Sequence, residues 1–196
     1  MNPTHLVLAS SSPYRKQILE KLNLPFIACS PNIDESAEPN ESAKAMVARV
    51  TKEKALAIQG DFPGHLIISS DQIATLNDST ILTKPHTHEN AVNQLQACSG
   101  NSVTFLTGLS LLNTITNHHQ LIIEPFEVVF RSLSDQEIEN YLRLEKPYDC
   151  AGSFKVEGLG ICLFEKLAGD DINTLVGLPL IRLLELLRNE SINPLI

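Results

Sequence analysis

The segment from Leu6 to Leu22 constrains the fold most, because it predicts a strand, a turn and a helix in immediate succession. Residues 6–9 are apolar and are typical of a buried strand. Ser12 stands at the preferred N-cap position, and Pro13 follows as the first helical residue, where its fixed φ suits the helix. The apolar and aromatic residues that come next share one helix face: Tyr14, Ile18, Leu19 and Leu22. The segment therefore predicts a helix that begins directly after a buried strand.

Two cations, Arg15 and Lys16, occupy the first turn of this predicted helix. A helix N-terminus carries partial positive charge, so cations are unfavourable there unless an anion offsets them. Hydroxyl groups, free N–H groups and cations at one helix end are typical of a phosphate site. The same pattern also fits a capped surface helix whose basic side chains point into water.

The composition limits the partners of such a site. The net charge of −8, from 15 basic and 23 acidic residues, argues against nucleic acid or an anionic membrane surface. A small phosphorylated ligand still fits, because screening confines surface charge to about 8–10 Å. No apolar run approaches the roughly 18 residues of a membrane span, and residues 1–5 lack the basic start of a secretory signal. The 196 residues, 43% of them hydrophobic, suit one domain with room for two lobes.

The cysteines and histidines give no strong metal pattern. The four cysteines have no CxxC pair and no zinc-type spacing: Cys29, Cys98, Cys150 and Cys162. Reduced thiols in the core and a cytosolic setting are expected. The spacing of the pairs His86/His88 and His118/His119 favours hydrated loop positions over a metal site.

Beyond residue 22 the apolar patterns predict further strands and helices. Strands are expected at residues 26–29, 65–70, 103–112, 120–130 and 161–165. Helices are expected at residues 43–59, 88–98, 134–144 and 180–188, with Ser42 as an N-cap and Ser134 opening a capping box. The two long strands indicate an antiparallel hairpin around residues 116–119, and Asn77 to Ser79 indicate a hairpin turn.

Two carboxylate-bearing segments are candidates for chemistry. The polar loop 30–42 has four acids and no base, which suits either a divalent cation near Asp34 and Glu35 or a hydrated loop. Asp71 comes directly after the strand at 65–70, and ligands of open α/β sheets bind at the carboxyl ends of strands. This position suits a catalytic carboxylate, and the alternative is an aspartate that only ends the strand.

Five polar clusters lie at the expected ends of these elements: residues 10–16, Asp34–Glu35, Lys54, residues 70–72 and Lys84–Pro85. In that order and spacing they resemble the Maf family of nucleoside triphosphate pyrophosphatases. The segments AGSFKVEG at 151–158 and NTLVGLP at 173–179 also look like that family, and the resemblance covers about Leu6 to Leu187. It implies a Maf/Ham1-like α/β fold of residues 1–196, with an elongated mixed β-sheet flanked by helices and two lobes around a central cleft.

The resemblance also implies a reaction, in which water attacks the α-phosphorus of a nucleoside triphosphate and releases pyrophosphate. It implies Asp71 as the proton acceptor, and it implies a divalent cation. Glu35, with Asp34 behind it, is the expected ligand of Mg²⁺ or Mn²⁺, and Asp71 either takes a proton, binds the metal or does both. Cations must stabilise the phosphoryl charge. The expected substrate-binding residues are Ser10, Ser12, Arg15, Lys16, Lys54 and Lys84.

Three residues stand at positions that the family associates with substrate choice: Tyr14, Gln72 and Glu157. Together they resemble the subfamily that acts on 7-methyl-GTP. Tyr14 could stack on the positively charged methylated base, a cation–π contact of about 0.5–2 kcal/mol. Glu157 could accept two hydrogen bonds from the guanine edge, and Gln72 could contact another edge. Core packing of Tyr14 and hydration of Glu157 are the alternatives.

Two other functions stay open at this point. One is a dTTP or UTP pyrophosphatase of the same family, and the other is a non-catalytic nucleotide-binding regulator of septum formation. The resemblance further implies a housecleaning activity, a cytoplasmic location and a possible homodimer. Ser70 and Thr83 stand where many relatives have glycine.

Overall fold

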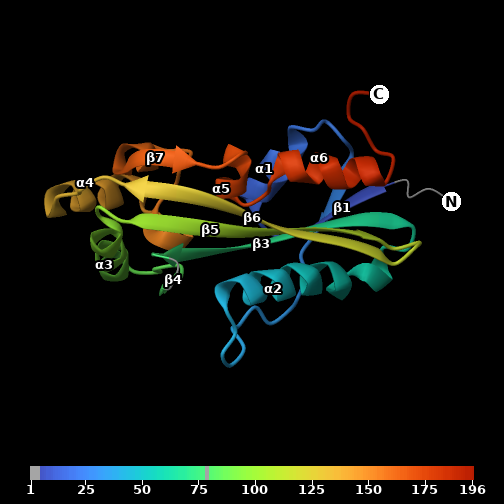
Figure 1. Ribbon diagram of the computed structural model, residues 1–196, viewed down its shortest axis with the longest axis horizontal. Coiled ribbons are helices and arrows are strands. Elements are labelled where there is room, and N and C mark those ends of the chain that lie inside the picture. The colour runs from blue at the N-terminus through green and yellow to red at the C-terminus, as the bar shows by residue number, and fades with distance from the viewer. Residues whose placement is uncertain (1–4, 78–79) are drawn as a thin grey trace. The chain divides into compact units, whose positions relative to one another are not determined.

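The computed structural model describes residues 5–77 and 80–196 (Figure 1). The strands are β1 (His5–Ala9), β2 (Phe26–Cys29), β3 (His65–Leu76), β4 (Thr80–Leu82), β5 (Ser102–Asn113), β6 (His118–Phe130) and β7 (Phe164–Ala168). The helices are α1 (Pro13–Glu20), α2 (Ala43–Ala57), α3 (His88–Cys98), α4 (Asp135–Glu145), α5 (Ile172–Val176) and α6 (Leu180–Asn189). Three short 3₁₀ turns complete the described part: η1 (Gln59–Asp61), η2 (Ala151–Ser153) and η3 (Leu159–Leu163).

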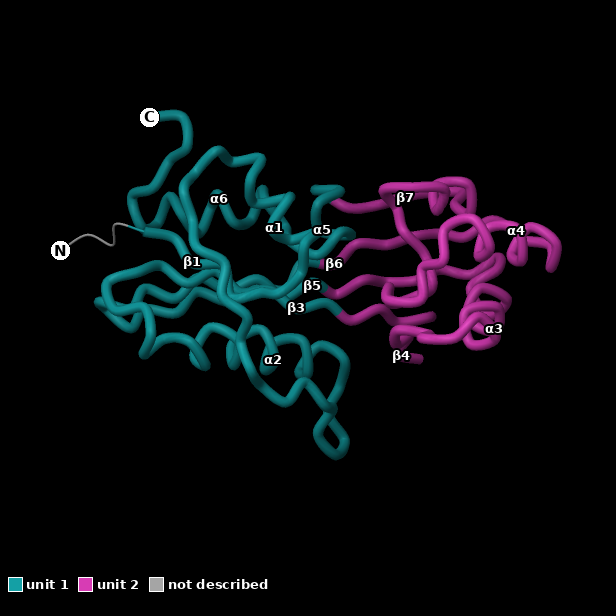
Figure 2. Tube along the Cα trace, turned by 180° about the vertical axis from the view of Figure 1, so that it is seen from behind, with its two compact units in different colours: residues 1–72, 107–124, 170–196 teal, residues 73–106, 125–169 magenta. Residues whose placement is uncertain are grey.

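Within the described residues, seven strands form one mixed sheet in the order β2-β1-β3-β5-β6-β7, and β4 pairs with β3. The expectation of an α/β fold with a mixed sheet is therefore confirmed. The chain divides into two compact units, which Figure 2 colours separately. Unit 1 contains residues 1–72, 107–124 and 170–196, and unit 2 contains residues 73–106 and 125–169.

In unit 1, β1 lies between β2 and β3 and pairs in parallel with both, with Leu6 opposite Phe26 on one side and Leu66 on the other. Parallel strands are normally covered on both faces, which explains the unbroken apolar run of β1. Val7 and Leu8 are completely buried.

The strands of unit 1 direct alternate side chains to two helix-covered faces. On one face, Leu8 and Ile68 belong to a core cluster that includes residues of α1 and α6. On the other face, Val7 and Ile67 belong to a cluster that includes the end of α2. Figure 1 shows α1 and α6 on one side of these strands and α2 on the other. The same alternation decides which helix each polar residue of β3 meets.

In unit 2, β4 and β7 pair antiparallel with β3 and β6. Phenylalanine rings pack edge to face, with centroids 5.5 Å apart for Phe105 and Phe154 and 4.9 Å apart for Phe154 and Phe164. The helices α3 and α4 pack against each other in this unit.

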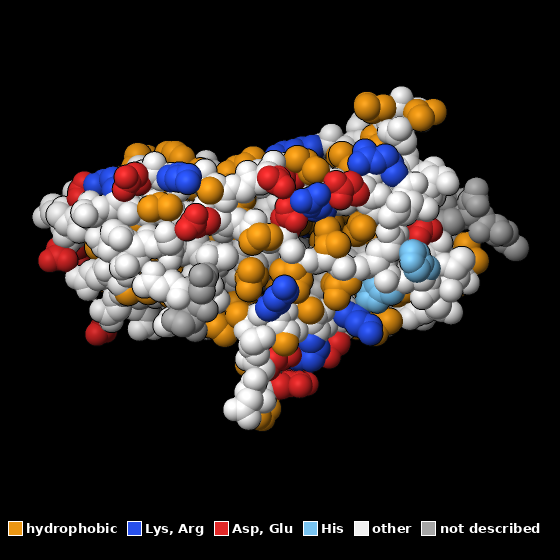
Figure 3. Space-filling model, in the orientation of Figure 1, with side chains coloured by type: hydrophobic (Ala, Val, Ile, Leu, Met, Phe, Trp, Pro, Cys, Tyr) orange, Lys and Arg blue, Asp and Glu red, His pale blue; other side chains and the backbone are white. Residues whose placement is uncertain are grey.

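On the face of the molecule that Figure 3 shows, acidic and basic side chains are interspersed.

The predicted helix starts are confirmed. The Ser12 hydroxyl accepts a hydrogen bond from Arg15 N, and the Ser42 hydroxyl accepts one from Ala45 N. Ser134 and Glu137 form the expected capping box at α4. These contacts involve residues only three positions apart, so local sequence is enough to predict them. The long hairpin is also confirmed, because β5 and β6 are neighbours in the sheet.

Some predicted boundaries are wrong. The strand expected at 161–165 begins only at Phe164, because residues 159–163 form the turn η3. The strand expected at 65–70 continues to Leu76, so Asp71 lies inside β3 rather than after it. Pairing of β3 with β5, and of residues 74–76 with β4, explains this extension. Neither β4 nor α5 was predicted, and Asp78 and Ser79 of the expected turn lie outside the described residues.

The four cysteines are free, but only Cys98 is buried in the core as expected. Burial raises the pKa of Cys98 to about 12. Cys29 and Cys150 are half-buried and Cys162 is exposed, so the expectation of core thiols is wrong for these three. Among the described residues, no helix combines the length and apolarity needed to cross a membrane.

The histidine pairs have separate contacts. His88 contacts the Tyr148 hydroxyl and the Glu139 carboxylate, and His118 contacts Glu190. His119 is half-buried, and burial lowers its pKa, with a further contribution from the charge of Lys52. In the described ranges, no group of three or more His, Cys, Asp or Glu side chains is placed to hold a metal ion.

Candidate active site

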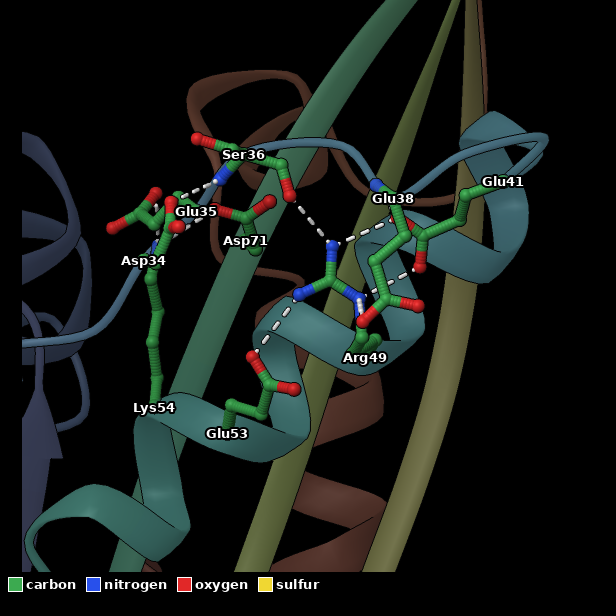
Figure 4. Close-up of polar contacts among 9 residues, drawn as sticks. All are labelled: Asp34, Glu35, Ser36, Glu38, Glu41, Arg49, Glu53, Lys54 and Asp71. Carbon is green, nitrogen blue, oxygen red and sulfur yellow. Dashed lines mark hydrogen bonds and ion pairs between the residues drawn. The ribbon is translucent and has the colours of Figure 1, made fainter.

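Lys54 is the centre of a charged cluster in unit 1 (Figure 4). Its Nζ donates a hydrogen bond to Asp71 Oδ1 at 2.7 Å and lies 2.9 Å from Glu35 Oε2. Lys54 is only 5% exposed, and a buried ammonium group needs such partners because an unpaired buried charge is very costly. Three residues predicted for the site, from α2, β3 and the 30–42 loop, therefore lie together.

The approach of α2 to the sheet is fixed next to this cluster. The Ser69 hydroxyl of β3 donates to the backbone oxygen of Thr51 at 2.6 Å, three residues before Lys54. A Cβ atom added to Gly108 of β5 would overlap Thr51 Oγ1 and lie 3.1 Å from Val47 O. Only glycine permits this close contact, which sets how deeply Lys54 reaches toward Asp71.

Arg15 is held at the start of α1 by the closing segment of unit 1. Its Nε donates to the backbone oxygen of Gly177 at 2.9 Å. The single proton of the Ser70 hydroxyl is shared between that oxygen, at 2.8 Å, and the backbone oxygen of Gly108, at 2.7 Å. Burial lowers the pKa of Arg15, while the negative charges of Asp71 and Glu35 oppose that shift. Gly177 has a φ of +108°, a left-handed conformation that favours glycine. The bond through Nε orients the guanidinium group. Its two Nη groups have the spacing to donate to two phosphate oxygens.

The hydroxyl groups before α1 are ordered by the backbone. Ser10 Oγ accepts from Ser12 N at 3.1 Å, and Ser12 Oγ accepts from Arg15 N at 3.3 Å. A hydroxyl that accepts one bond keeps its own proton as a donor. Lys16 follows on the exposed side of the first turn, and Tyr14 is half-buried.

Gln72 lies on the face of β3 opposite to Asp71. Its Nε2 donates to Thr107 Oγ1 and Thr174 O, both at 2.9 Å, and lies 3.2 Å from Leu175 O. Thr107 Oγ1 uses its own proton on Thr174 O, so it must accept from Gln72. These partners fix which end of the amide is nitrogen, and the other end of the Gln72 amide is therefore a carbonyl oxygen, which can only accept.

The remaining predicted residues belong to unit 2. Lys84 follows β4 and is exposed, and Glu157 is exposed in the segment between η2 and η3. The backbone around Glu157 is anchored, because Lys155 N donates to the Tyr141 hydroxyl at 3.0 Å and Leu159 N donates to Glu145 Oε1 at 3.0 Å. The structure thus brings Lys54, Glu35 and Asp71 into contact within unit 1, and it describes Lys84 and Glu157 within unit 2 only.

Glu35 and Asp71 could hold a metal ion, because both carboxylates lie within reach of a single ammonium group. Mg²⁺ in proteins commonly uses one or two carboxylates and completes its octahedron with water and substrate phosphate oxygens. The two oxygen donors fit an ion that shares its ligands with a substrate.

Sequence reasoning missed Arg49 of α2, which contacts three acids. Two signals were available. Arg49 and Glu53 are four residues apart on one helix, and the 30–42 loop has four acids but no base of its own.

The chain belongs to the Maf family, because the family's sequence model, described as Maf-like protein, matches residues 5–190. Several curated relatives are named 7-methyl-GTP pyrophosphatase. The relative from Pseudomonas fluorescens Pf-5 is 56% identical, over 95% of this chain and 97% of its own length. The relative from Nitrosococcus oceani is 54% identical over 94% of this chain and 92% of its own. The relative from Pseudomonas aeruginosa PAO1 is 53% identical over 95% of this chain and 97% of its own length.

Among solved structures, the Staphylococcus aureus Ham1 protein matches with a TM-score of 0.43 and 11% sequence identity. The match covers 80% of this chain and 90% of that one. No conclusion rests on a likeness of this size.

Proposed function

We propose that this protein is a nucleoside triphosphate pyrophosphatase that hydrolyses 7-methyl-GTP to the monophosphate and pyrophosphate, as a housecleaning enzyme. The substrate is supported by the nearly full-length relatives of that name at 53–56% identity. The structural observation that carries the proposal is the buried Lys54 ammonium group, which contacts both Asp71 and Glu35. A buried cation with two carboxylates suits phosphoanhydride hydrolysis, which needs a proton acceptor and positive charge at one place.

Each residue has a role in this reaction. Asp71, oriented by Lys54, accepts the proton of the attacking water. Arg15 binds two phosphate oxygens through its planar fork, and the Ser10 and Ser12 hydroxyls donate to others. Lys16, Lys54 and Lys84 supply point charges to the triphosphate.

A divalent cation, Mg²⁺ or Mn²⁺, completes the proposal. Glu35 and Asp71 would hold it, with Asp34 behind them. When bound, the ion would neutralise phosphate charge and help to orient the triphosphate. Support comes from the two hard oxygen donors that already share one cationic partner.

Base selection is proposed for Tyr14, Gln72 and Glu157. Gln72 commits its Nε2 to Thr107 and Thr174, so its carbonyl oxygen is the group left to meet an N–H donor of a base. Guanine offers N1–H and N2–H₂ as donors, which also suit the Glu157 carboxylate. Tyr14 would stack on the positively charged methylated ring.

The domain organisation, the cellular location and the assembly are also part of the proposal. A single Maf-like domain of residues 1–196 is supported by the family match, which runs through residues of both units. A cytoplasmic location is supported by the free and partly exposed thiols, which fit a reducing compartment. A homodimer is the proposed assembly.

The test is a panel of 7-methyl-GTP, GTP, dTTP and UTP with Mg²⁺ or Mn²⁺, with pyrophosphate release as the readout. We expect the highest kcat/KM for 7-methyl-GTP, and a loss of about 100-fold or more in kcat for Asp71→Asn, with nucleotide binding retained. Preference for dTTP or UTP would overturn the substrate assignment. Full activity of Asp71→Asn would overturn the role of Asp71 as proton acceptor. No hydrolysis of any nucleotide by the unmodified protein would instead favour a regulator that only binds nucleotide.

A further inference from the structure

Arg49 binds the 30–42 loop to α2 through several hydrogen bonds (Figure 4). Its Nε donates to Glu41 Oε1 at 2.7 Å, and its Nη2 donates to Glu41 Oε2 at 2.8 Å and to the backbone oxygen of Ser36 at 2.9 Å. Its Nη1 donates to Glu53 Oε2 at 3.1 Å on the same helix. One guanidinium group therefore fixes two separate points of the loop.

The loop needs such an anchor, because residues 30–42 contain neither helix nor strand. Within it, Ser36 N donates to Asp34 Oδ1 at 2.9 Å, and Glu38 N donates to Glu41 Oε2 at 3.0 Å. Both bonds are local and exposed to solvent. The contacts of Arg49 connect this exposed loop to the helix that carries Lys54.

The Arg49 contacts differ in strength. The Glu41 side chain is only 8% exposed and receives both arms of the fork, the geometry of a strong arginine–carboxylate pair. The Glu38 side chain is 65% exposed and lies 3.6 Å from Nε, so that contact contributes little. The bonds to Glu41 and to Ser36 O are therefore the ones that hold the loop.

The position of the Ser36 bond connects this anchor to the candidate active site. Glu35 directly precedes Ser36, and its carboxylate meets the Lys54 ammonium group at 2.9 Å. The Glu35 side chain is 54% exposed, so burial alone does not hold it there. Fixing the next backbone oxygen restricts where that carboxylate can go.

We propose that Arg49 is a positioning residue, which holds the 30–42 loop so that Glu35 stays opposite Lys54 and Asp71. The proposal rests on the proposed function, in which Glu35 helps to bind the divalent cation. Arg49 itself touches no reacting group and acts through Glu41 and Ser36.

The experiment compares Arg49→Gln and Arg49→Lys with a matched control, Arg182→Gln. Arg182 is also a unit 1 arginine with three acidic partners, Glu124, Asp170 and Glu185, and none of them belongs to the loop. Each glutamine variant removes one charge and several ion pairs. Only the Arg49 variants release the loop, so stability effects can be separated from positioning.

Two readouts are needed. The first is kcat/KM for 7-methyl-GTP together with the Mn²⁺ concentration for half-maximal activity. Loss of residues that orient metal ligands typically lowers metal affinity or activity about 10–100-fold. For Arg49→Gln we therefore expect kcat/KM to fall at least about 10-fold, and the Mn²⁺ concentration for half-maximal activity to rise at least about 10-fold. Arg49→Lys keeps the charge without the fork and should restore part of the loss, while Arg182→Gln should match the unmodified protein.

The second readout needs neither metal nor nucleotide. Glutamyl endopeptidase should cleave after Glu35 and Glu41 faster in Arg49→Gln than in Arg182→Gln, with sites identified by mass spectrometry. Equal cleavage rates, or faster cleavage with unchanged kcat/KM and Mn²⁺ dependence, would each overturn the positioning role.

Two further outcomes have a defined meaning. If Arg49→Gln does not fold, Arg49→Lys and Glu41→Gln carry the same comparison, because each breaks the two-armed contact between Arg49 and Glu41. If the unmodified protein hydrolyses no nucleotide, the proposed function fails. The proteolysis comparison then still decides whether Arg49 holds the loop.

Discussion

Asp71 and Gln72 are consecutive residues of β3 with opposite surroundings. Asp71 faces α2, where it pairs with the charged Lys54, whereas Gln72 faces neutral partners, Thr107 and Thr174. The period of two along a strand produces this contrast, since neighbouring side chains point to opposite faces. One strand can therefore supply a charged group for chemistry and a neutral acceptor for recognition. We expect changes on the charged face to affect rate, and changes on the neutral face to affect selectivity.

The largest effect is expected from Lys54→Met, on the charged face. The change leaves Asp71, whose side chain is 12% exposed, without its cation. Breaking a buried ion pair from one side costs about 3 kcal/mol or more in the free energy of unfolding. We also expect a fall of about 100-fold or more in kcat, from the lost electrostatic stabilisation. Urea unfolding and pyrophosphate release measure the two effects.

Lys52→Met is the matched control, because Lys52 is exposed on the same helix. The double variant Asp71→Asn with Lys54→Met should recover part of the lost stability, since no buried unpaired charge remains. If Lys52→Met and Lys54→Met lost the same unfolding free energy and the same kcat, the buried ion pair of Lys54 with Asp71 would have no special role.

A smaller effect is expected from Thr107→Val, on the neutral face. Thr107 is completely buried, and its hydroxyl accepts from Gln72 and donates to Thr174 O. Valine has a similar shape without the hydroxyl, so we expect a loss of about 1 kcal/mol in the free energy of unfolding. Because Gln72 loses one anchor, KM for 7-methyl-GTP should rise while kcat is kept. A fall in kcat with unchanged KM would contradict the division of roles between the two faces.

The smallest effect concerns the acid stability of the 30–42 loop, which brings Glu35 to the charged face. Hydrogen bonding from Arg49, and then from Glu38 N, lowers the pKa of Glu41 from 4.5 to about 2. A carboxylate whose pKa is lower in the folded state stabilises the fold at pH values above 4.5, and that contribution is lost as the pH falls toward 2. Unfolding measured between pH 5 and pH 2 should therefore show a weaker pH dependence in Arg49→Gln than in the unmodified protein. Identical pH slopes would contradict the pairing of Glu41 with Arg49.

Local sequence was sufficient where a structure depends on nearby residues. The N-caps Ser12 and Ser42 and the capping box at Ser134 each join residues three positions apart, and all three were predicted. The end of β3 was not predicted, because β3 pairs with β5 and, at its last residues, with β4, a strand of only three residues. Strand pairing depends on a partner elsewhere in the chain, which a local pattern does not contain.

For the candidate site, the sequence by itself determined the residue types and their order, including Arg15, Lys54 and Asp71, because motif spacing is written along the chain. Only the tertiary structure decided the partners. It placed Glu35 and Asp71 at one ammonium group, tied Arg15 and Ser70 to the same Gly177 oxygen, and gave the 30–42 loop its anchor in Arg49. The physical reason is distance: these contacts join residues 8 to 162 positions apart, and only folding brings such groups within hydrogen-bonding range.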